Sequence, residues 1–181
     1  MLKNLVPHFK VVVPLDQPSV EQSADEIKET VIRALVSKAN IRDEAKVEEV
    51  VQSLLSREAK GSTGLGRNIA IPHARTECIE KPVIVLGVCQ EGIDWEAQDG
   101  KHVILFFLIL VPLEQSDLYL RILTRLTSLV RQEGFVAAVK KCESEDTALD
   151  TIHDFELKLK LEAGRAAISG ANREKPSTKQ L

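Results

Sequence analysis

Residues 102–111 read HVILFFLILV, and this run decides the fold. Almost every position is apolar, and Pro112 follows the run directly. A strand that is apolar on both faces is typical of the centre of a sheet that helices cover on both sides. The run is too short to cross a bilayer, which needs about 20 residues. We therefore expect a buried central strand and no membrane span.

The segments on either side of this run predict the remaining layers. Apolar residues recur at helical spacing in residues 24–38, 44–57, 115–132 and 135–142, and in a last helix that follows Ser144. Apolar and β-branched runs predict further strands over residues 9–16, where Pro14 marks an edge, and over residues 67–73 and 81–89. This order of elements is typical of one layered α/β domain.

Length and composition limit the class of protein. The chain has 181 residues, enough for one domain with a hydrophobic core. A net charge of −3 and an aromatic content of 4% argue against a nucleic-acid-binding protein. From Gly164 onward the residues are small and polar, so they bury little apolar surface. We expect a folded domain over residues 1–160 and a flexible tail over residues 161–181.

The cysteines and histidines show no metal-binding spacing. The three cysteines form no C-x-x-C pair, and the four histidines are scattered without an H-E-x-x-H pattern. We expect free thiols in a reducing compartment, no metal and no cofactor. The first residues, MLKNLVPHFK, lack the continuous apolar stretch of a secretion signal. These features predict a cytoplasmic protein.

The stretch GSTGLGRNIAIPHAR, residues 61–75, raises the question of a nucleotide site because three glycines precede a short apolar run. The glycine order is not the Rossmann G-x-G-x-x-G, and no Walker G-K-[ST] follows it. Both of those loops join a strand to a helix, whereas this stretch follows a predicted helix and opens a predicted strand. We therefore exclude a nucleotide-binding loop.

Two interpretations of this stretch remain open from the residues alone. It is a turn that leads into a strand, since glycine-rich segments are mostly turns. Alternatively, Pro72 stiffens a strand end that carries His73, whose neutral imidazole is a good nucleophile near pH 7. Backbone N–H groups and hydroxyls would then face an anion, with Arg57 and Arg75 adding positive charge. Such groups suit transient phosphorylation of a histidine nitrogen.

The residues REAKGSTGLGRNIAIPHAR, 57–75, closely resemble the signature of the type-2 enzyme IIA domains of the bacterial phosphotransferase system. These domains include a fructose–mannitol type and a nitrogen-regulatory type. The likeness covers residues 10–157 and includes FFLILVP, residues 106–112, where such domains carry a buried strand that ends in Val-Pro. It implies a single α/β domain whose central mixed sheet is flanked by helices on both faces.

The resemblance implies a role for two residues of the signature. His73 corresponds to the histidine that accepts phosphate from the carrier protein HPr or its nitrogen-type paralogue. Arg57 corresponds to an arginine that compensates charge near the phosphoryl group. The other ring nitrogen of His73 is expected to donate a hydrogen bond to a carbonyl or carboxylate, which the sequence does not identify.

Further residues are expected to bind the phosphate or to shape its site: Ser62, Thr63, Gly64 and Arg75. For Ser62 and Thr63, stabilising the turn is an equally open role. Tyr119 stands where the family commonly has a second histidine, and we expect it in the site or in packing. A phenol donates a hydrogen bond without the charge of an imidazolium. Trp95, in a polar loop, is expected to cover the site or a partner surface.

Three functions follow from these observations. The first is a phosphocarrier of the phosphoenolpyruvate-dependent phosphotransferase system, which passes phosphate to a IIB domain or uses it as a regulatory signal. The second is a nitrogen-regulatory binding module that controls a kinase or a transporter with little or no phosphotransfer. The third is a purely structural α/β domain. None of the three binds nucleic acid or spans a membrane.

Overall fold

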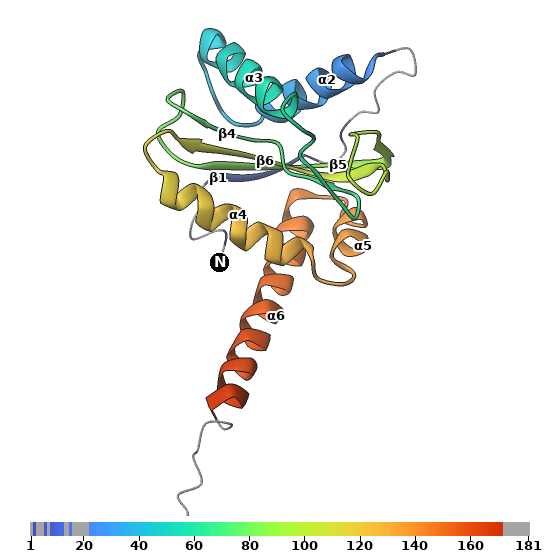
Figure 1. The fold of residues 1–181 in the computed structure, drawn as a ribbon, viewed down its shortest axis with the longest axis vertical. Coiled ribbons are helices and arrows are strands. Elements are labelled where there is room, and N and C mark those ends of the chain that lie inside the picture. The colour runs from blue at the N-terminus through green and yellow to red at the C-terminus, as the bar shows by residue number, and fades with distance from the viewer. Residues whose placement is uncertain (1, 3–5, 7, 13–14, 16–21, 172–181) are drawn as a thin grey trace, which may run out of the picture.

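The computed structural model describes residues 2, 6, 8–12, 15 and 22–171 of the chain. Its helices and strands follow one another in this order: β1 (His8–Val12), α2 (Ala24–Val36), α3 (Glu44–Glu58), β2 (Gly64–Gly66), β3 (Ile69–Ala70), β4 (His73–Thr76), β5 (Val83–Ile93), β6 (Val103–Pro112), α4 (Ser116–Val130), α5 (Phe135–Lys140) and α6 (Glu145–Ala171). The strands form one central sheet between two groups of helices (Figure 1).

Strand β6 is the centre of this sheet. Along one side it pairs antiparallel with β5, whose other side pairs parallel with β1. Along its second side β6 pairs in parallel first with β3 and then with β4. Strand β2 extends the sheet beyond β3 as an antiparallel neighbour. The sheet is therefore mixed, and the apolar run 102–111 forms its central strand, as predicted.

Two hydrophobic cores lie on opposite faces of the sheet. Phe106, Leu108 and Leu110 of β6 join the core that includes residues of α2 and α3. The alternate residues, Phe107 and Ile109 among them, join a second core with residues of α4, α5 and α6. The side chains of a strand alternate between its faces, so a run apolar at every position serves both cores. The predicted fold class, with helices on both faces, is confirmed (Figure 1).

Helices α2 and α3 begin at residues whose side chains cap them. Ser23 and Glu26 form a reciprocal capping box at the start of α2, with the Ser23 N–H donating to the Glu26 carboxylate at 2.7 Å. The Asp43 side chain accepts hydrogen bonds from the first turn of α3. Gly134 adopts a φ of 78° between α4 and α5, a conformation that favours glycine. These local signals explain why the predicted helix starts agree with the structure.

The segment 64–76 differs from the single strand that we predicted over residues 67–73. It contains the three short strands β2, β3 and β4. Arg67 and Asn68 have φ values of 56° and 65°, which form a two-residue type I′ hairpin turn between β2 and β3. Pro72 has no N–H to donate, so regular pairing is interrupted before β4, although the Pro72 carbonyl accepts from Ile109 at 2.9 Å.

The C-terminal helix also differs from our expectation. Helix α6 continues to Ala171, so residues 161–171 are helical where we predicted a flexible tail. Residues 172–181 lie outside the described part of the chain, as does Pro14 in the predicted strand 9–16. The division of the chain at residue 160 stays a prediction. No helix among the described residues is both long enough and apolar enough to cross a bilayer.

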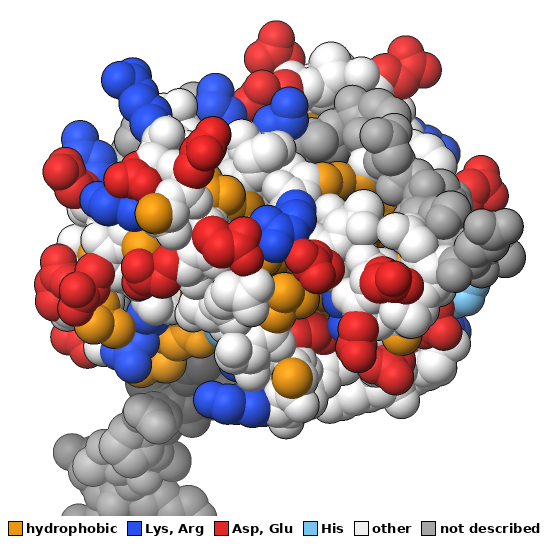
Figure 2. Space-filling model, turned by 90° about the horizontal axis from the view of Figure 1, so that it is seen from above, with side chains coloured by type: hydrophobic (Ala, Val, Ile, Leu, Met, Phe, Trp, Pro, Cys, Tyr) orange, Lys and Arg blue, Asp and Glu red, His pale blue; other side chains and the backbone are white. Residues whose placement is uncertain are grey.

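The surface over α2 and α3 carries acidic and basic side chains side by side (Figure 2). Arg33 illustrates this mixing, since it contacts the carboxylates of both Glu29 and Glu48. Interspersed charges of both signs produce no extended positive field on this face.

Candidate functional site

A pocket of about 360 Å³ brings together the end of α3, strand β4 and the start of α4. Four of the predicted site residues line it: Arg57, His73, Arg75 and Tyr119. The others that line it are Ser53, Ser56, Lys60, Ala74 and Leu113. We refer to these nine residues as the His73 pocket. A wider pocket of about 530 Å³ beside Cys78 contains no histidine, so we place the candidate site at the His73 pocket.

Strand pairing determines where His73 lies. His73 is the first residue of β4, and its Cα pairs with that of Ile109 in the central strand. His73 and Arg75 are two residues apart, so their side chains point to the same side of β4. The side chain of Ala74, between them, points to the other side of β4 and joins the core that includes residues of α2 and α3. The central strand thus fixes the backbone from which the imidazole projects.

Both nitrogens of the His73 ring have partners. Arg57 Nε lies 3.3 Å from His73 Nε2, and His73 Nδ1 lies 2.6 Å from the carbonyl oxygen of Ile71. The arginine N–H only donates, so Nε2 is the acceptor and carries no proton. Nδ1 therefore holds the proton and donates to Ile71. The acceptor that the sequence did not identify is a backbone carbonyl two residues away.

The surroundings of His73 keep its ring neutral. Burial lowers the pKa of His73 below its ordinary value, and the nearby positive charge of Arg57 acts in the same direction. The hydrogen bond to Ile71 and the negative charge of Glu58 oppose this shift without reversing it. At pH 7 the ring is uncharged, with the Nε2 lone pair directed toward Arg57. This is the protonation state that a nucleophilic imidazole requires.

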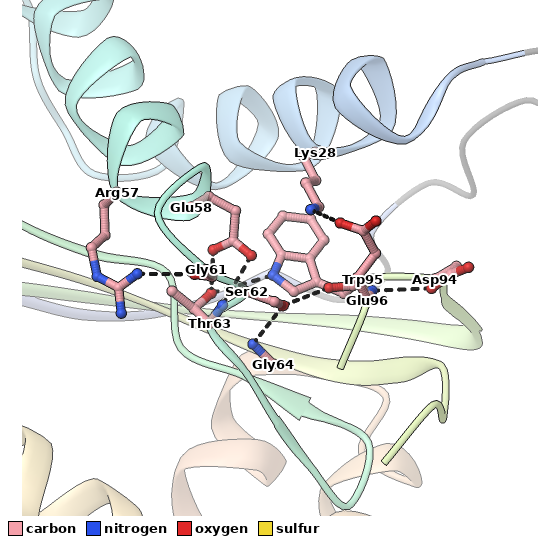
Figure 3. Close-up of polar contacts among 10 residues, drawn as sticks. All are labelled: Lys28, Arg57, Glu58, Gly61, Ser62, Thr63, Gly64, Asp94, Trp95 and Glu96. Carbon is pink, nitrogen blue, oxygen red and sulfur yellow. Dashed lines mark hydrogen bonds and ion pairs between the residues drawn. The ribbon is translucent and has the colours of Figure 1, made fainter. Parts of the chain in front are cut away.

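Arg57 is held at both ends of its guanidinium group. Its Nη1 donates to the carbonyl oxygen of Gly61 at 3.0 Å, while its Nε donates to His73. Figure 3 shows the contact between Arg57 and Gly61. With Arg57 and Arg75, Lys60 is one of three positive side chains in the lining of the pocket. The glycine stretch therefore contributes a backbone oxygen that orients the arginine.

Tyr119 of α4 lies close to both His73 and Arg75. The ring centroids of Tyr119 and His73 are 5.7 Å apart, and Arg75 Cζ lies 6.0 Å from the Tyr119 centroid. Arg75 Nη1 also donates to the hydroxyl of Ser116 in the first turn of α4. Burial raises the pKa of Tyr119, with Arg57 and Arg75 opposing the rise. Tyr119 is therefore a neutral phenol at pH 7, able to donate a hydrogen bond.

Ser62, Thr63 and Gly64 do not line the His73 pocket. The Ser62 hydroxyl donates to the Trp95 carbonyl at 2.6 Å and accepts from the Gly64 N–H at 3.1 Å. A Cβ atom on Gly64 would lie 2.8 Å from Ala97, so only glycine fits there. These contacts favour the turn-stabilising role for Ser62, and the phosphate-binding role of the three residues stays a prediction.

Glu58, the residue after Arg57, belongs to a second group of hydrogen-bonded residues, which we call the Thr63 cluster: Glu58, Ser62, Thr63 and Trp95 (Figure 3). The Glu58 carboxylate accepts from the Thr63 N–H at 2.9 Å and from the Thr63 hydroxyl at 2.6 Å. Glu58 was missed by the sequence reasoning, although a signal existed. It lies four residues after Leu54 and seven after Val51, on the buried face of α3.

Trp95 is fully buried, so the expectation that it covers the site or a partner surface is wrong. Its ring packs edge-on against Phe106 with centroids 5.0 Å apart, and its Nε1 donates to the Thr63 hydroxyl at 3.3 Å. The polar neighbours of Trp95 in the sequence conceal this burial. Asp94 and Glu96 face outward while the indole points into the core.

No metal centre is evident in the part of the chain that the structure describes. No group of three or more His, Cys, Asp or Glu side chains there is close enough together to hold a metal ion. The side chains that line the His73 pocket include imidazole, guanidinium, ammonium and phenol groups.

Comparison with known proteins points to one family. The model of the family described as "Phosphoenolpyruvate-dependent sugar phosphotransferase system, EIIA 2" matches residues 16–155. The fructose-specific EIIA component of Haloferax volcanii is 33% identical over 150 residues, which cover 81% of this chain and 96% of that protein. The fructose-specific EIIABC component of Bacillus subtilis is 36% identical over 102 residues, 56% of this chain but only 16% of that larger protein. A nitrogen regulatory protein of Pseudomonas aeruginosa is 33% identical over 81 residues, 45% of this chain and 53% of that protein.

Solved structures agree with this assignment. The nitrogen regulatory protein IIA-Ntr of Neisseria meningitidis superposes with a TM-score of 0.62 at 25% identity, covering 78% of this chain and 92% of that one. IIA mannitol of Escherichia coli superposes with a TM-score of 0.61 at 21% identity, covering 79% and 95%. The same fold occurs in an E. coli complex of enzyme IIAMTL with phosphorylated enzyme IIBMTL, with a TM-score of 0.62 at 20% identity, covering 81% and 99%.

Proposed function

This chain belongs to the EIIA 2 family of the phosphoenolpyruvate-dependent sugar phosphotransferase system, and we propose that it is a phosphocarrier that is phosphorylated on Nε2 of His73. One observation carries the proposal. The unprotonated nitrogen of a neutral imidazole lines a pocket with Arg57, Lys60 and Arg75, while the protonated nitrogen is held by the Ile71 carbonyl. A nucleophile, fixed positive charge and a partner for the other nitrogen are what phosphoryl transfer requires.

The donor in this proposal is a phosphohistidine of HPr or of its nitrogen-type paralogue. The Nε2 lone pair of His73 attacks the phosphorus in line with the donor nitrogen–phosphorus bond. As the new bond forms, the old one breaks, and its electron pair returns to the donor ring. The proton on Nδ1 stays in place, and the hydrogen bond to the Ile71 carbonyl stabilises the positive charge that develops on the ring.

Arg57 has to exchange partners during this step. In the unphosphorylated protein its Nε–H occupies the position that the phosphorus must approach. The bond from Nη1 to Gly61 anchors the guanidinium, so a small rotation releases Nε2 and turns the group toward the phosphoryl oxygens. Arg75 and Lys60 extend the positive lining of the pocket. Positive charge already in place favours the spread of negative charge in the transition state.

The acceptor of the phosphoryl group in this proposal is a IIB domain or a regulatory target. A relative with the same fold forms a complex with phosphorylated enzyme IIBMTL, which supports the first. The likeness to nitrogen regulatory proteins supports the second.

Cys78, Cys89 and Cys142 are all unpaired, which supports the cytoplasmic location expected from the sequence.

A regulatory binding module with little or no transfer is the second candidate function. Tyr119 favours it, because a phenol in the position of a second histidine supplies no positive charge to the pocket. In that case the His73 pocket would bind a kinase or a transporter without turnover.

One experiment separates these functions. The protein is incubated with enzyme I, with HPr or its nitrogen paralogue, and with labelled phosphoenolpyruvate. We expect a label that survives base, is lost in mild acid and is absent from His73→Ala. His153→Ala, an exposed histidine on α6, is the matched control and should label like the wild type. Absence of label with every donor would overturn the phosphocarrier proposal and leave the binding module.

A further inference from the structure

Glu58 is a buried carboxylate next to the arginine of the site. It is 4% exposed, and both of its oxygens accept hydrogen bonds from Thr63. A carboxylate is costly to bury unless its oxygens are satisfied. Glu58 and Thr63 therefore hold each other firmly and close the intervening residues 59–62 into a loop.

The loop connects Glu58 to the Nε2 side of the His73 ring. The Glu58 backbone carbonyl accepts from the Gly61 N–H at 3.0 Å. The Gly61 carbonyl accepts from Arg57 Nη1 at 3.0 Å, and Arg57 Nε donates to Nε2 of His73. The direction of the Gly61 carbonyl, and with it the guanidinium, depends on how the loop is closed.

Thr63 connects Glu58 to the Nδ1 side of the same ring. The Thr63 carbonyl accepts from the Ile71 N–H at 3.1 Å. The Ile71 carbonyl, in turn, accepts from Nδ1 of His73 at 2.6 Å. Thr63 therefore fixes the peptide segment that selects the tautomer. The indole of Trp95 holds the Thr63 hydroxyl from the other side, at 3.3 Å.

We propose that Glu58 is a positioning residue that, through Thr63, sets the partners of both nitrogens of His73. One branch runs through Gly61 to Arg57 and Nε2, and the other through Ile71 to Nδ1. The inference rests on the proposed function, in that it explains how the acceptor nitrogen is kept unprotonated and directed at Arg57. Glu58 contacts neither the ring nor the phosphoryl group.

The first test observes the ring in the unphosphorylated protein and needs no donor. Nitrogen-15 NMR of the His73 imidazole in the wild type should show a protonated Nδ1 and an unprotonated Nε2. In Glu58→Gln one oxygen acceptor is replaced by an amide, and we expect the single-tautomer pattern to be lost. Glu49→Gln, the same change at an exposed position of α3, should keep the wild-type pattern.

The second test measures the rate of phosphorylation by the donor. We expect Glu58→Gln to slow transfer by about tenfold or more, because a small displacement of reacting groups is costly. Thr63→Val removes the hydroxyl and should do the same, while Thr63→Ser keeps it and should recover most of the rate. If Glu58→Gln does not fold, the pair of Thr63 variants decides by the same two measurements.

The outcomes distinguish this inference from the proposed function. A folded Glu58→Gln protein with the wild-type tautomer pattern and rate overturns the positioning role and leaves the phosphocarrier intact. A changed tautomer pattern in a protein that no donor labels supports the positioning role while the phosphocarrier proposal fails. Loss of thermal stability alone, with the pattern unchanged in the folded protein, assigns Glu58 to structure and contradicts the inference.

Discussion

The His73 pocket and the Thr63 cluster contain consecutive residues of α3, Arg57 and Glu58, whose side chains differ in burial and in hydrogen bonding. Arg57 is half-buried in the pocket and shares its hydrogen bonds with a ring nitrogen and a backbone carbonyl. Glu58 is buried in the cluster, where Thr63 satisfies both of its oxygens. The polar groups of the pocket can therefore exchange their hydrogen-bond partners, whereas the polar groups of the cluster are fixed by theirs. Substitutions in the His73 pocket should therefore change transfer with little change in stability, whereas substitutions in the Thr63 cluster should lower stability and also slow transfer through the positioning of His73.

The largest effect should come from removing the side chain that anchors the cluster. Trp95→Ala deletes a fully buried aromatic ring, and we expect the free energy of unfolding to fall by about 3–5 kcal/mol. Urea denaturation of wild type and variant measures the difference. Trp95→Phe, which keeps a ring but loses the indole N–H, should lose less. A decrease below about 1 kcal/mol for Trp95→Ala would contradict the burial seen here.

In contrast to Trp95→Ala, Arg57→Ala should slow phosphoryl transfer strongly and change the stability little. The variant removes a charged donor aimed at the phosphoryl position, and we expect the transfer rate to fall by about a hundredfold. The free energy of unfolding should change by only about 0.5 kcal/mol, because the side chain is half-buried on a helix. Lys60→Ala removes the same charge from the pocket lining and should slow transfer less. Equal losses in the two variants would mean that charge alone matters.

Tyr119 offers a smaller and more informative change. Tyr119→His restores an imidazole beside His73, and we expect single-turnover labelling to become faster, on the order of tenfold. Tyr119→Phe keeps the ring and removes only the hydroxyl, and it should slow labelling by a few-fold if the phenol donates to the phosphoryl group. If neither variant changes the rate, Tyr119 serves packing alone.

The smallest effect should appear in the pH dependence of stability. Burial lowers the pKa of folded His73, whereas an unfolded histidine titrates near its ordinary value of about 6.5. As pH falls through that value, the unfolded chain binds a proton that the folded protein does not, so stability decreases. The loss is complete below the folded pKa.

Chemical denaturation between pH 8 and pH 5 measures this effect. His73→Gln lacks the titrating group, so its stability should decrease less over this range than that of the wild type. His153→Gln, at an exposed position, should follow the wild type. A His73→Gln profile parallel to that of the wild type would show that the pKa of His73 is not lowered.

The sequence was sufficient for the parts of the fold that local signals determine. The apolar run predicted β6, and apolar residues at helical spacing predicted the helices, with Ser23 and Glu26 marking the start of α2. It was insufficient for β2, β3 and β4, because β3 and β4 exist only as partners of β6, a distant segment. The same limit applies to the site. His73 and Arg57 could be predicted as a pair, but the Ile71 carbonyl is backbone and carries no sequence signal.

The pairing of β4 with β6 has a consequence for how the protein acquires its chemistry during synthesis. His73 leaves the ribosome before Ile109, the residue that its Cα pairs with, has been translated. Contacts between such distant segments form only after the chain between them has closed. Until then the imidazole is an ordinary solvent-exposed histidine, without Arg57 on one nitrogen or a fixed carbonyl on the other. If His73 is the phosphate acceptor that we propose, a nascent chain that stops short of β6 would contain the whole glycine–histidine motif and yet accept no phosphate.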